Sequence, residues 1–84
     1  MKDFQDNISL LTRDLMRIKN ISQNDLARAR GVTHAAISRK LSGHMRWTLQ
    51  DVIFLSDFFK IPLSSFISNE VAPAVRQYEQ AREQ

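Results

Sequence analysis

Apolar residues recur at helical intervals along most of this chain, and polar and apolar positions nowhere alternate for long. Over residues 4–19 they follow steps of four, three, four and three, which places five of them on one helical stripe: Phe4, Ile8, Leu11, Leu15 and Ile18. Asp3, directly before this segment, can cap the start of the helix or interact with its dipole. The pattern predicts an amphipathic first helix with this stripe in the core.

Hydroxyl residues and glycines mark two further short helices. Ser22 is a good N-cap, because its side-chain oxygen accepts from the free N–H groups of a first turn. Gly31 can end this second helix in the left-handed conformation, where a Cβ atom would be unfavourable. Thr33 is placed to cap a third helix over residues 34–42, and Gly43 ends it in the same way.

Two more helices are predicted in the C-terminal half. Thr48 caps a fourth helix over about residues 49–60, which Pro62 stops because proline is tolerated only in a first turn. A short fifth helix over residues 62–67 carries the next apolar residues, Leu63, Phe66 and Ile67. Helices therefore account for all the periodic segments of the chain.

These elements indicate an all-α fold, a compact bundle of about five short helices. We expect residues 1–67 to form the domain and residues 68–84 to form a linker and a C-terminal tail or short helix. Within the second part, residues 68–73 are typical of a linker, and residues 74–84 of a frayed helix or a disordered tail.

Composition narrows the class of protein. The chain has 84 residues, enough for one domain, and no cysteine, which excludes disulfides and thiolate metal sites. The longest apolar run, residues 52–55, is far shorter than the roughly 20 residues that span a bilayer. The N-terminus has no apolar segment typical of a signal peptide. We expect an intracellular, cytoplasmic protein with no membrane partner.

Basic residues are concentrated in one part of the chain. Residues 13–46 hold eight basic and two acidic side chains, a formal charge of +6, whereas the remainder holds four basic and seven acidic ones. Such asymmetry favours a polyanionic partner such as nucleic acid. A solvated helical surface rich in arginine would produce the same pattern, so charge alone leaves both interpretations open.

The second and third helices, with the glycine turn between them, have the residues that a helix-turn-helix unit requires. Ala27 is small enough for the next helix to cross close above it, and Gly31 makes the turn. Val32 fills the corner between the helices. Ile37 and Leu41, four residues apart, face back into the core.

The opposite face of the third helix has the chemistry of a helix that enters the major groove of DNA. With Ile37 pointing inward, steps of about 100° turn four residues outward: Ala35, Ser38, Arg39 and Ser42. His34 lies at the first turn, nearer the flank. Arg39 is the strongest candidate, because arginine donates two parallel hydrogen bonds to guanine.

At this point the sequence resembles the lambda-repressor-like (Cro/repressor, XRE-type) helix-turn-helix family. The resemblance rests on Ile21-Ser22-Gln23, Leu26-Ala27, Gly31-Val32-Thr33, Ile37-Ser38 and Leu41-Ser42-Gly43, then on Thr48-Leu49, Val52-Ile53, Phe59-Lys60-Ile61-Pro62-Leu63 and Phe66. It covers about residues 8–67. It implies a sequence-specific, double-stranded-DNA-binding transcriptional regulator, a phage- or prokaryote-type repressor that blocks transcription by occupying its operator and works at the nucleoid.

The resemblance also implies roles for individual residues. Four fall where the family reads bases: His34, Ala35, Ser38 and Arg39. Six fall where phosphate contacts are expected: Gln23, Thr33, Lys40, Ser42, His44 and Arg46. The sequence departs from the family at Ala35, which can offer only a methyl group, at Met16, where many members have arginine, and at Lys60, where glycine is usual.

For several residues the pattern leaves two interpretations open. Trp47 is either a core or loop anchor or a DNA contact, and Lys40, toward the flank of its helix, contacts phosphate or nothing. Arg13 and Arg17 are either solvated charges or phosphate contacts. We expect no enzyme, metal site, cofactor or small-molecule ligand, because the two histidines lack a nearby carboxylate constellation and no phosphate-cradling loop is present.

The fourth helix suggests a partner surface. If its core face consists of Leu49, Val52, Ile53, Ser56 and Phe59, then Phe54 and Phe58 lie nearly opposite, with Leu55 beside them. Two exposed phenylalanines favour a homodimer interface at Phe54, Leu55 and Phe58. Coverage by apolar residues of the tail (Val71, Val75 and Tyr78) is the other interpretation. A protein-interaction module that uses the Phe54 and Phe58 surface without binding DNA is the alternative function.

Overall fold

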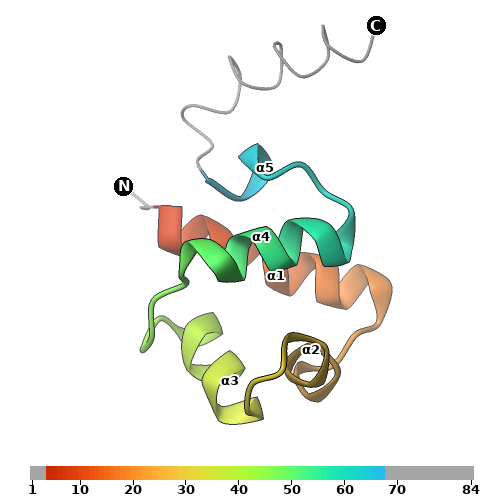
Figure 1. Cartoon of the computed structure of the whole chain (residues 1–84), viewed down its shortest axis with the longest axis vertical. Helices are drawn as coiled ribbons and strands as arrows, with labels where there is room; N and C mark the ends of the chain where they lie inside the picture. Colours follow the sequence, from red (N-terminus) through yellow and green to blue (C-terminus); the bar gives the residue numbers. More distant parts are fainter. Residues whose placement is uncertain (1–3, 68–84) are drawn as a thin grey trace, which may run out of the picture.

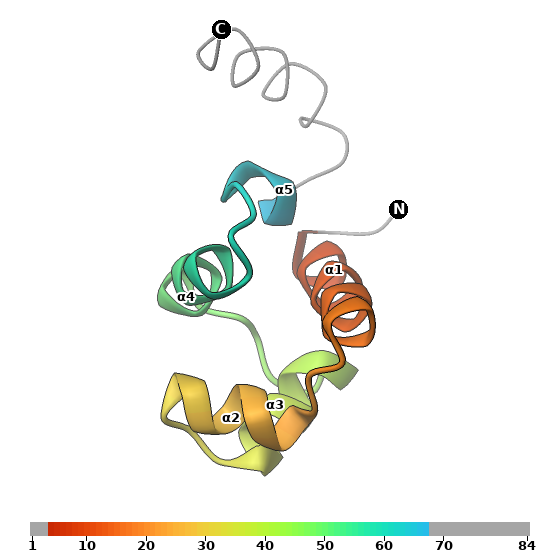
Figure 2. The same ribbon diagram turned by 90° about the vertical axis from the view of Figure 1, so that its right-hand side faces the viewer.

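The computed structural model describes residues 4–67, and within this range the chain is all-α, as predicted. It contains α1 (Phe4–Lys19), α2 (Gln23–Arg30), α3 (His34–Ser42), α4 (Leu49–Phe59) and α5 (Ser64–Ile67). α1 and α4 form two sides of the molecule, with the α2–α3 pair across one end and α5 across the other (Figures 1 and 2). None of these helices is long and apolar enough to cross a membrane.

The predicted caps of α2 and α3 are confirmed. Ser22 Oγ accepts from the backbone N–H of Asp25 at 3.0 Å, and the Asp25 carboxylate accepts from Ser22 N at 3.1 Å. Thr33 Oγ1 accepts from Ala36 N at 3.1 Å. Gly31 and Gly43 end the two helices in the left-handed conformation, with φ of 82° and 88°. The expected cap of α1 at Asp3 lies outside the described residues.

Helix α4 begins as predicted and ends one residue early. Thr48 and Asp51 form a second capping box, with Thr48 N donating to Asp51 Oδ2 at 2.8 Å. Lys60 takes the left-handed conformation that ends the helix, with φ of 59°, and its backbone N–H makes a last helical bond to Ser56 O. Helix α5 starts at Ser64 rather than at residue 62, because residues 61–63 turn the chain before it.

The buried stripe of α1 differs from the predicted one. Its core residues are Ile8, Thr12, Leu15 and Met16. Ile18 is 69% exposed and Phe4 is also exposed, so these two assignments to the core are wrong. Helix α1 packs against α3, α4 and α5. This rotates the buried face toward Thr12 and Met16 and away from Ile18.

The predicted core face of α4 is confirmed at Val52 and Phe59 and wrong at Leu49 and Ile53. Leu49 is 70% exposed and Ile53 51%, whereas Leu55 is only 1% exposed and lies in the core beside the other inward residues, Val52 and Phe59. Phe54 and Phe58 are half-buried against the core and stack on each other, with ring centroids 5.3 Å apart. Compared with the prediction, the helix is rotated by about 90° around its axis.

The rotation of α4 has two physical causes. Apolar residues surround most of this helix, so the hydrophobic pattern alone cannot determine which side is buried. Asp51 faces α2 and α3, where it pairs with Arg30 and Lys40, and these ion pairs favour the observed orientation of the helix. Arg30 also lies over the Phe54 ring, 5.8 Å from its centroid. The predicted dimer interface at Phe54, Leu55 and Phe58 is therefore not an exposed apolar surface.

Candidate nucleic-acid interface

The turn between α2 and α3 is built as the sequence predicts. Gly31 N and Val32 N both donate to Ala27 O, at 2.8 and 3.0 Å, which closes the end of α2. Ala27, Ile37 and Leu41 are buried, as expected. α2 and α3 pack directly against each other. The turn and this packing fix the face that α3 presents to solvent.

That outward face of α3 carries the candidate base-reading residues. His34, Ala35 and Arg39 are exposed, and Ser38 is half-buried. Helical geometry puts these four within about 140° of the helix circumference, so a single flat ligand can meet all of them. Arg39 has no ion-pair partner among residues 4–67. Its guanidinium is therefore available for a ligand.

A polar stripe on α1 holds the last turn of α3 and the loop after it. Gln5, Ser9 and Arg13 are four residues apart and share one side of the helix. Ser9 Oγ donates to the carbonyl of residue 40 at 3.1 Å, and Arg13 Nη2 donates to the carbonyl of residue 41 at 3.1 Å. These bonds satisfy carbonyls that a helix end leaves free. The prediction from sequence missed this stripe, although its spacing of four was visible.

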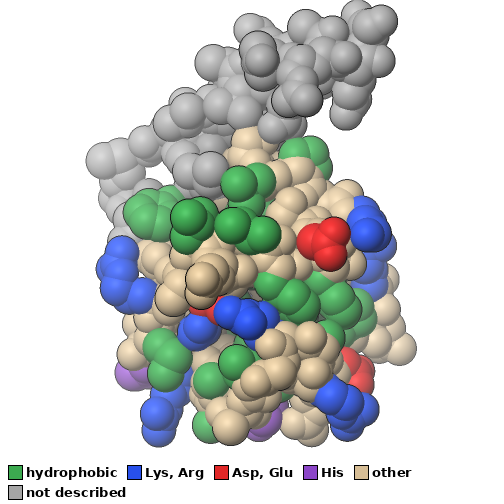
Figure 3. Space-filling view, in the orientation of Figure 1, with side chains coloured by type: hydrophobic (Ala, Val, Ile, Leu, Met, Phe, Trp, Pro, Cys, Tyr) green, Lys and Arg blue, Asp and Glu red, His purple; other side chains and the backbone are tan. Residues whose placement is uncertain are grey.

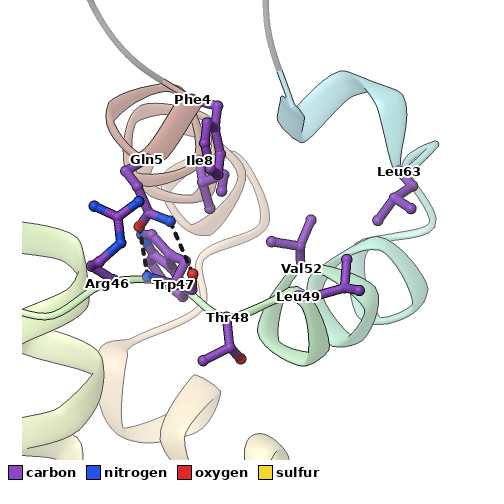
Figure 4. Close-up of a pocket in the computed structure, with 9 residues that line it drawn as sticks. All are labelled: Phe4, Gln5, Ile8, Arg46, Trp47, Thr48, Leu49, Val52 and Leu63. Carbon is purple, nitrogen blue, oxygen red and sulfur yellow. Dashed lines mark hydrogen bonds between the residues drawn. The ribbon is translucent and has the colours of Figure 1, made fainter.

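Trp47 is an internal anchor of the loop between α3 and α4. Its side chain is only 5% exposed, and its Nε1 donates to Ser9 Oγ at 2.8 Å. Gln5 forms two hydrogen bonds with the Trp47 backbone, accepting from its N–H at 2.6 Å and donating to its carbonyl at 2.9 Å (Figure 4). The anchor interpretation of Trp47 is confirmed, and little of its side chain is exposed for a contact with DNA.

Lys40 does not lie where a phosphate contact requires it. The residue is 9% exposed, and its ammonium group donates to Asp51 Oδ2 inside the protein. Its Nζ also lies 6.0 Å from the centroid of the Trp47 ring. This cation is committed to a buried carboxylate, which argues against the phosphate contact expected at Lys40.

Asp51 joins three helices at one carboxylate. Oδ1 accepts from Arg30 Nε at 3.2 Å, and Oδ2 accepts from Lys40 and from Thr48 N. Burial raises the pKa of Asp51, but its bonds to Lys40 and Thr48 outweigh burial and hold the pKa below the ordinary value of 3.8. Asp51 therefore stays ionised at neutral pH, although it is almost fully buried.

The basic segment keeps only part of its charge for a ligand. Arg30 and Lys40 pair with Asp51, and Arg17 pairs with Asp14 at 3.3 Å on the surface. Within residues 4–67 five cations of this segment have no ion-pair partner: Arg13, which donates to the carbonyl of residue 41, and Lys19, Arg28, Arg39 and Arg46. The charge that remains available is smaller than the +6 of the sequence segment suggests.

The remaining candidate phosphate-contacting residues differ in exposure and in the hydrogen bonds they already make. Gln23 is half-buried at the start of α2, and Thr33 is exposed but accepts the capping bond from Ala36 N. Ser42 Oγ donates to the backbone carbonyl of residue 39 at 3.2 Å and lies 2.8 Å from His44 Nδ1. His44 and Arg46 are exposed on the loop after α3. Thr33 lies at the N-terminal end of α3, and Ser42, His44 and Arg46 lie at its C-terminal end or in the loop that follows.

An apolar groove opens beside this loop. It encloses about 430 Å³ and is lined mainly by residues from the start of α1, the loop before α4 and the start of α4, among them Phe4, Trp47, Leu49 and Val52 (Figure 4). Hydrophobic side chains gather over α4 on the face shown in Figure 3. On α4, Leu49 and Ile53 are the exposed large apolar residues, whereas Phe54 and Phe58 are half-buried.

Comparisons of the chain with protein-family models, with curated proteins and with solved structures found no match. No group of three or more His, Asp or Glu side chains that could hold a metal ion lies within residues 4–67. The functional assignment of this surface therefore rests on the chemistry of its own residues.

Proposed function

We propose that this chain is a sequence-specific, double-stranded-DNA-binding transcriptional regulator of the lambda-repressor-like helix-turn-helix type, a repressor of phage or prokaryotic origin. The observation that carries this proposal is the outward face of α3. It presents an unpaired Arg39 among small and polar side chains, and α1 and α4 hold the last turn of the helix from two sides. A helix that reads base edges needs both features.

In this proposal the side chains of α3 read the major groove. Arg39 donates a bidentate pair of hydrogen bonds to guanine, worth about 1–3 kcal/mol of discrimination. Ala35 offers its methyl group to thymine, and His34 and Ser38 bond to neighbouring base edges or phosphates.

Phosphate contacts would supply most of the affinity and make it dependent on salt. Gln23, Thr33, Ser42, His44 and Arg46 remain the candidates, whereas Lys40 is excluded by its pairing with Asp51. Repression follows from occupancy, because a bound protein blocks the access of polymerase to the promoter. Such a regulator would work in the cytoplasm of a prokaryotic cell, at the nucleoid.

We further propose that the chain acts as a homodimer. Helix α3 has nine residues and is about 13 Å long, so one copy spans only about four base pairs. A second copy doubles the site and places two reading helices about 34 Å apart on a palindromic operator. The exposed Leu49 and Ile53, one turn apart beside the apolar groove, are the surface we assign to the second copy.

A protein-interaction module without DNA binding is the second candidate function. The same exposed Leu49 and Ile53 favour it, because they would suit a different protein as well as a second copy. The surface first expected for it, Phe54 and Phe58, is half-buried and stacked within the chain.

The test is affinity selection from a library of random duplexes, followed by fluorescence anisotropy of the enriched duplex and of a scrambled duplex across a salt series. We expect enrichment of a palindromic sequence, weaker binding of the scrambled duplex and a steep salt dependence. Arg39→Ala should lose at least about tenfold in preference for the enriched duplex. The absence of both enrichment and binding at low salt would contradict the DNA function.

Lys60→Asn is the matched control for Arg39→Ala. It also removes one positive charge, but at the exposed end of α4, and asparagine tolerates the left-handed conformation of that position. It should keep the preference of the wild type. Equal losses in the two variants would show that only net charge matters, and that Arg39 reads no base.

A further inference from the structure

One buried carboxylate lies where α2, α3 and α4 meet. Asp51 belongs to the first turn of α4 and is fixed there by the capping box with Thr48. Lys40 from α3 and Arg30 from the last turn of α2 donate to its two oxygens. Both helices of the candidate reading unit are thus bonded to a single side chain of a third helix.

Asp25 provides a comparison within the same molecule. It is also the third residue of its helix and forms the same capping box, with Ser22 in place of Thr48. Asp25 is exposed and has no ion pair within residues 4–67, whereas Asp51 has two. A capping carboxylate can therefore remain exposed, as Asp25 does. The feature that distinguishes the buried Asp51 is its pair of bonds to Arg30 and Lys40 on other helices.

The two ends of α3 are held differently. Near its C-terminal end, Ser9 and Arg13 hold backbone carbonyls from the side of α1, and Asp51 holds Lys40 from the side of α4. At its N-terminal end the side-chain bond within residues 4–67 is the local cap, in which Ala36 N donates to Thr33 Oγ1. The turn and the packing against α2 hold the N-terminal end of α3. The bonds from α1 and α4 act on its last turn, and they affect how the helix is tilted and where the base-reading residues point.

We propose that Asp51 is a positioning residue that sets the orientation of α3 relative to α4, and through it the sequence preference of DNA binding. The effect on DNA rests on the function proposed above, whereas the effect on helix orientation does not. Asp51 touches no DNA in this proposal. Without its charge the Lys40 ammonium would be buried and unpaired, which is strongly unfavourable. The Lys40 side chain then turns out to solvent and the last turn of α3 shifts with it.

The first experiment measures the free protein, with no DNA present. Residual dipolar couplings of backbone N–H groups give the angle between α3 and α4 in the wild type, in Asp51→Asn and in Asp25→Asn. We expect Asp51→Asn to change this angle by more than about 10°, beyond the tolerance of a functional site. Asp25→Asn removes the same capping charge and should leave the angle unchanged. An unchanged angle in folded Asp51→Asn overturns the proposal.

Lys40→Met keeps the proposal testable if Asp51→Asn does not fold. This variant removes the ammonium group, keeps an apolar side chain of similar length and leaves Asp51 bonded to Arg30 and Thr48. It should fold and still change the orientation of α3, because the bond between α3 and α4 is gone. An unchanged orientation in Lys40→Met means that packing alone positions the helix, and contradicts the proposal.

The second experiment measures DNA binding of the same variants at a temperature where each is folded. The ratio of the affinities for the enriched and the scrambled duplex should fall about tenfold in Asp51→Asn and in Lys40→Met, and remain at the wild-type value in Asp25→Asn. A stability loss alone would lower both affinities equally and leave the ratio unchanged, which overturns the role in specificity. If the helix tilts but the wild type binds no DNA, the positioning role holds and the proposed function fails.

Discussion

The indole N–H of Trp47 donates to the hydroxyl of Ser9 at 2.8 Å, which connects the loop after α3 to the middle of α1. The same hydroxyl donates to the backbone carbonyl of residue 40 at 3.1 Å, so one small side chain serves two partners in the half-buried interior. Within residues 4–67 neither the indole N–H nor this carbonyl is bonded to another side chain. Removal of the Ser9 hydroxyl should therefore cause a measurable loss of stability.

Ser9→Ala should lower the free energy of unfolding by about 1–3 kcal/mol, because it leaves a buried indole N–H and a helix-end carbonyl without this partner. Urea unfolding followed by the fluorescence of Trp47, the single tryptophan of the chain, measures the change. Ser65→Ala, a serine outside this network, is the control and should change stability much less. Equal effects of the two substitutions would contradict the role of Ser9.

Acid should destabilise the protein through Asp51. Its folded-state pKa lies below the ordinary value of 3.8, so the ionised carboxylate favours the folded state above that pH, and this contribution is lost as the pH falls through the folded pKa. The urea midpoint of the wild type should therefore fall below about pH 4. Asp51→Asn should be less stable at pH 7 and show a flatter decline in acid. Asp57→Asn, which changes an exposed carboxylate, should decline like the wild type.

Two threonines should respond to the same substitution with opposite signs. Thr12 is fully buried in α1, and its Oγ1 has no hydrogen-bond partner among residues 4–67. Thr12→Val should therefore raise the free energy of unfolding by about 1 kcal/mol, because it removes an unsatisfied polar atom at equal size. Thr33→Val should lower it by about 1 kcal/mol, because Thr33 caps α3. Thermal unfolding of both variants measures the two changes in stability. A lower stability of Thr12→Val would contradict the inference that Thr12 Oγ1 is unsatisfied.

The end of α4 offers a stabilising change. Lys60 has a left-handed backbone with φ of 59°, which costs a residue with a Cβ atom about 1–2 kcal/mol. Lys60→Gly should raise stability by up to about 1 kcal/mol, since the relief of this strain exceeds the entropy that glycine adds to the unfolded chain. Its exposed ion pair with Asp57, at 3.7 Å, contributes little. Lys60→Ala keeps the strained backbone, so it should not raise the stability of the protein. A gain in stability in Lys60→Ala would mean that removal of the positive charge, rather than relief of strain, is responsible.

The oligomeric state should depend on Ile53 rather than on Phe58. Ile53→Lys places a charge on the exposed side of α4 and should raise the dissociation constant of the proposed homodimer at least about tenfold in analytical ultracentrifugation. Asn24→Lys adds a positive charge at an exposed site on α2 and serves as the control, which should leave this dissociation constant unchanged. Monomeric behaviour of the wild type at high concentration would contradict the homodimer.

Local signals in the sequence were sufficient for the helices themselves. Ser22, Thr33 and Thr48 begin helices, and Gly31 and Gly43 end them, because capping depends only on atoms a few residues apart. The inward side of α3 was also predictable, since Ile37 and Leu41 are its only large apolar residues. A helix with a single apolar stripe can turn only that side toward the core.

Tertiary structure decided the orientation of α4 and which basic residues form ion pairs. Helix α4 is apolar on most sides, so the burial of Leu55 and the exposure of Leu49 follow from where Asp51 finds its partners. Lys40 was identifiable as a cation but not as a buried one, because its partner lies eleven residues away on another helix. The sequence by itself determined the helices, their caps and the outward face of α3. Only the fold decided which cations remain free on it, because ion pairs between helices depend on distances that no local pattern contains.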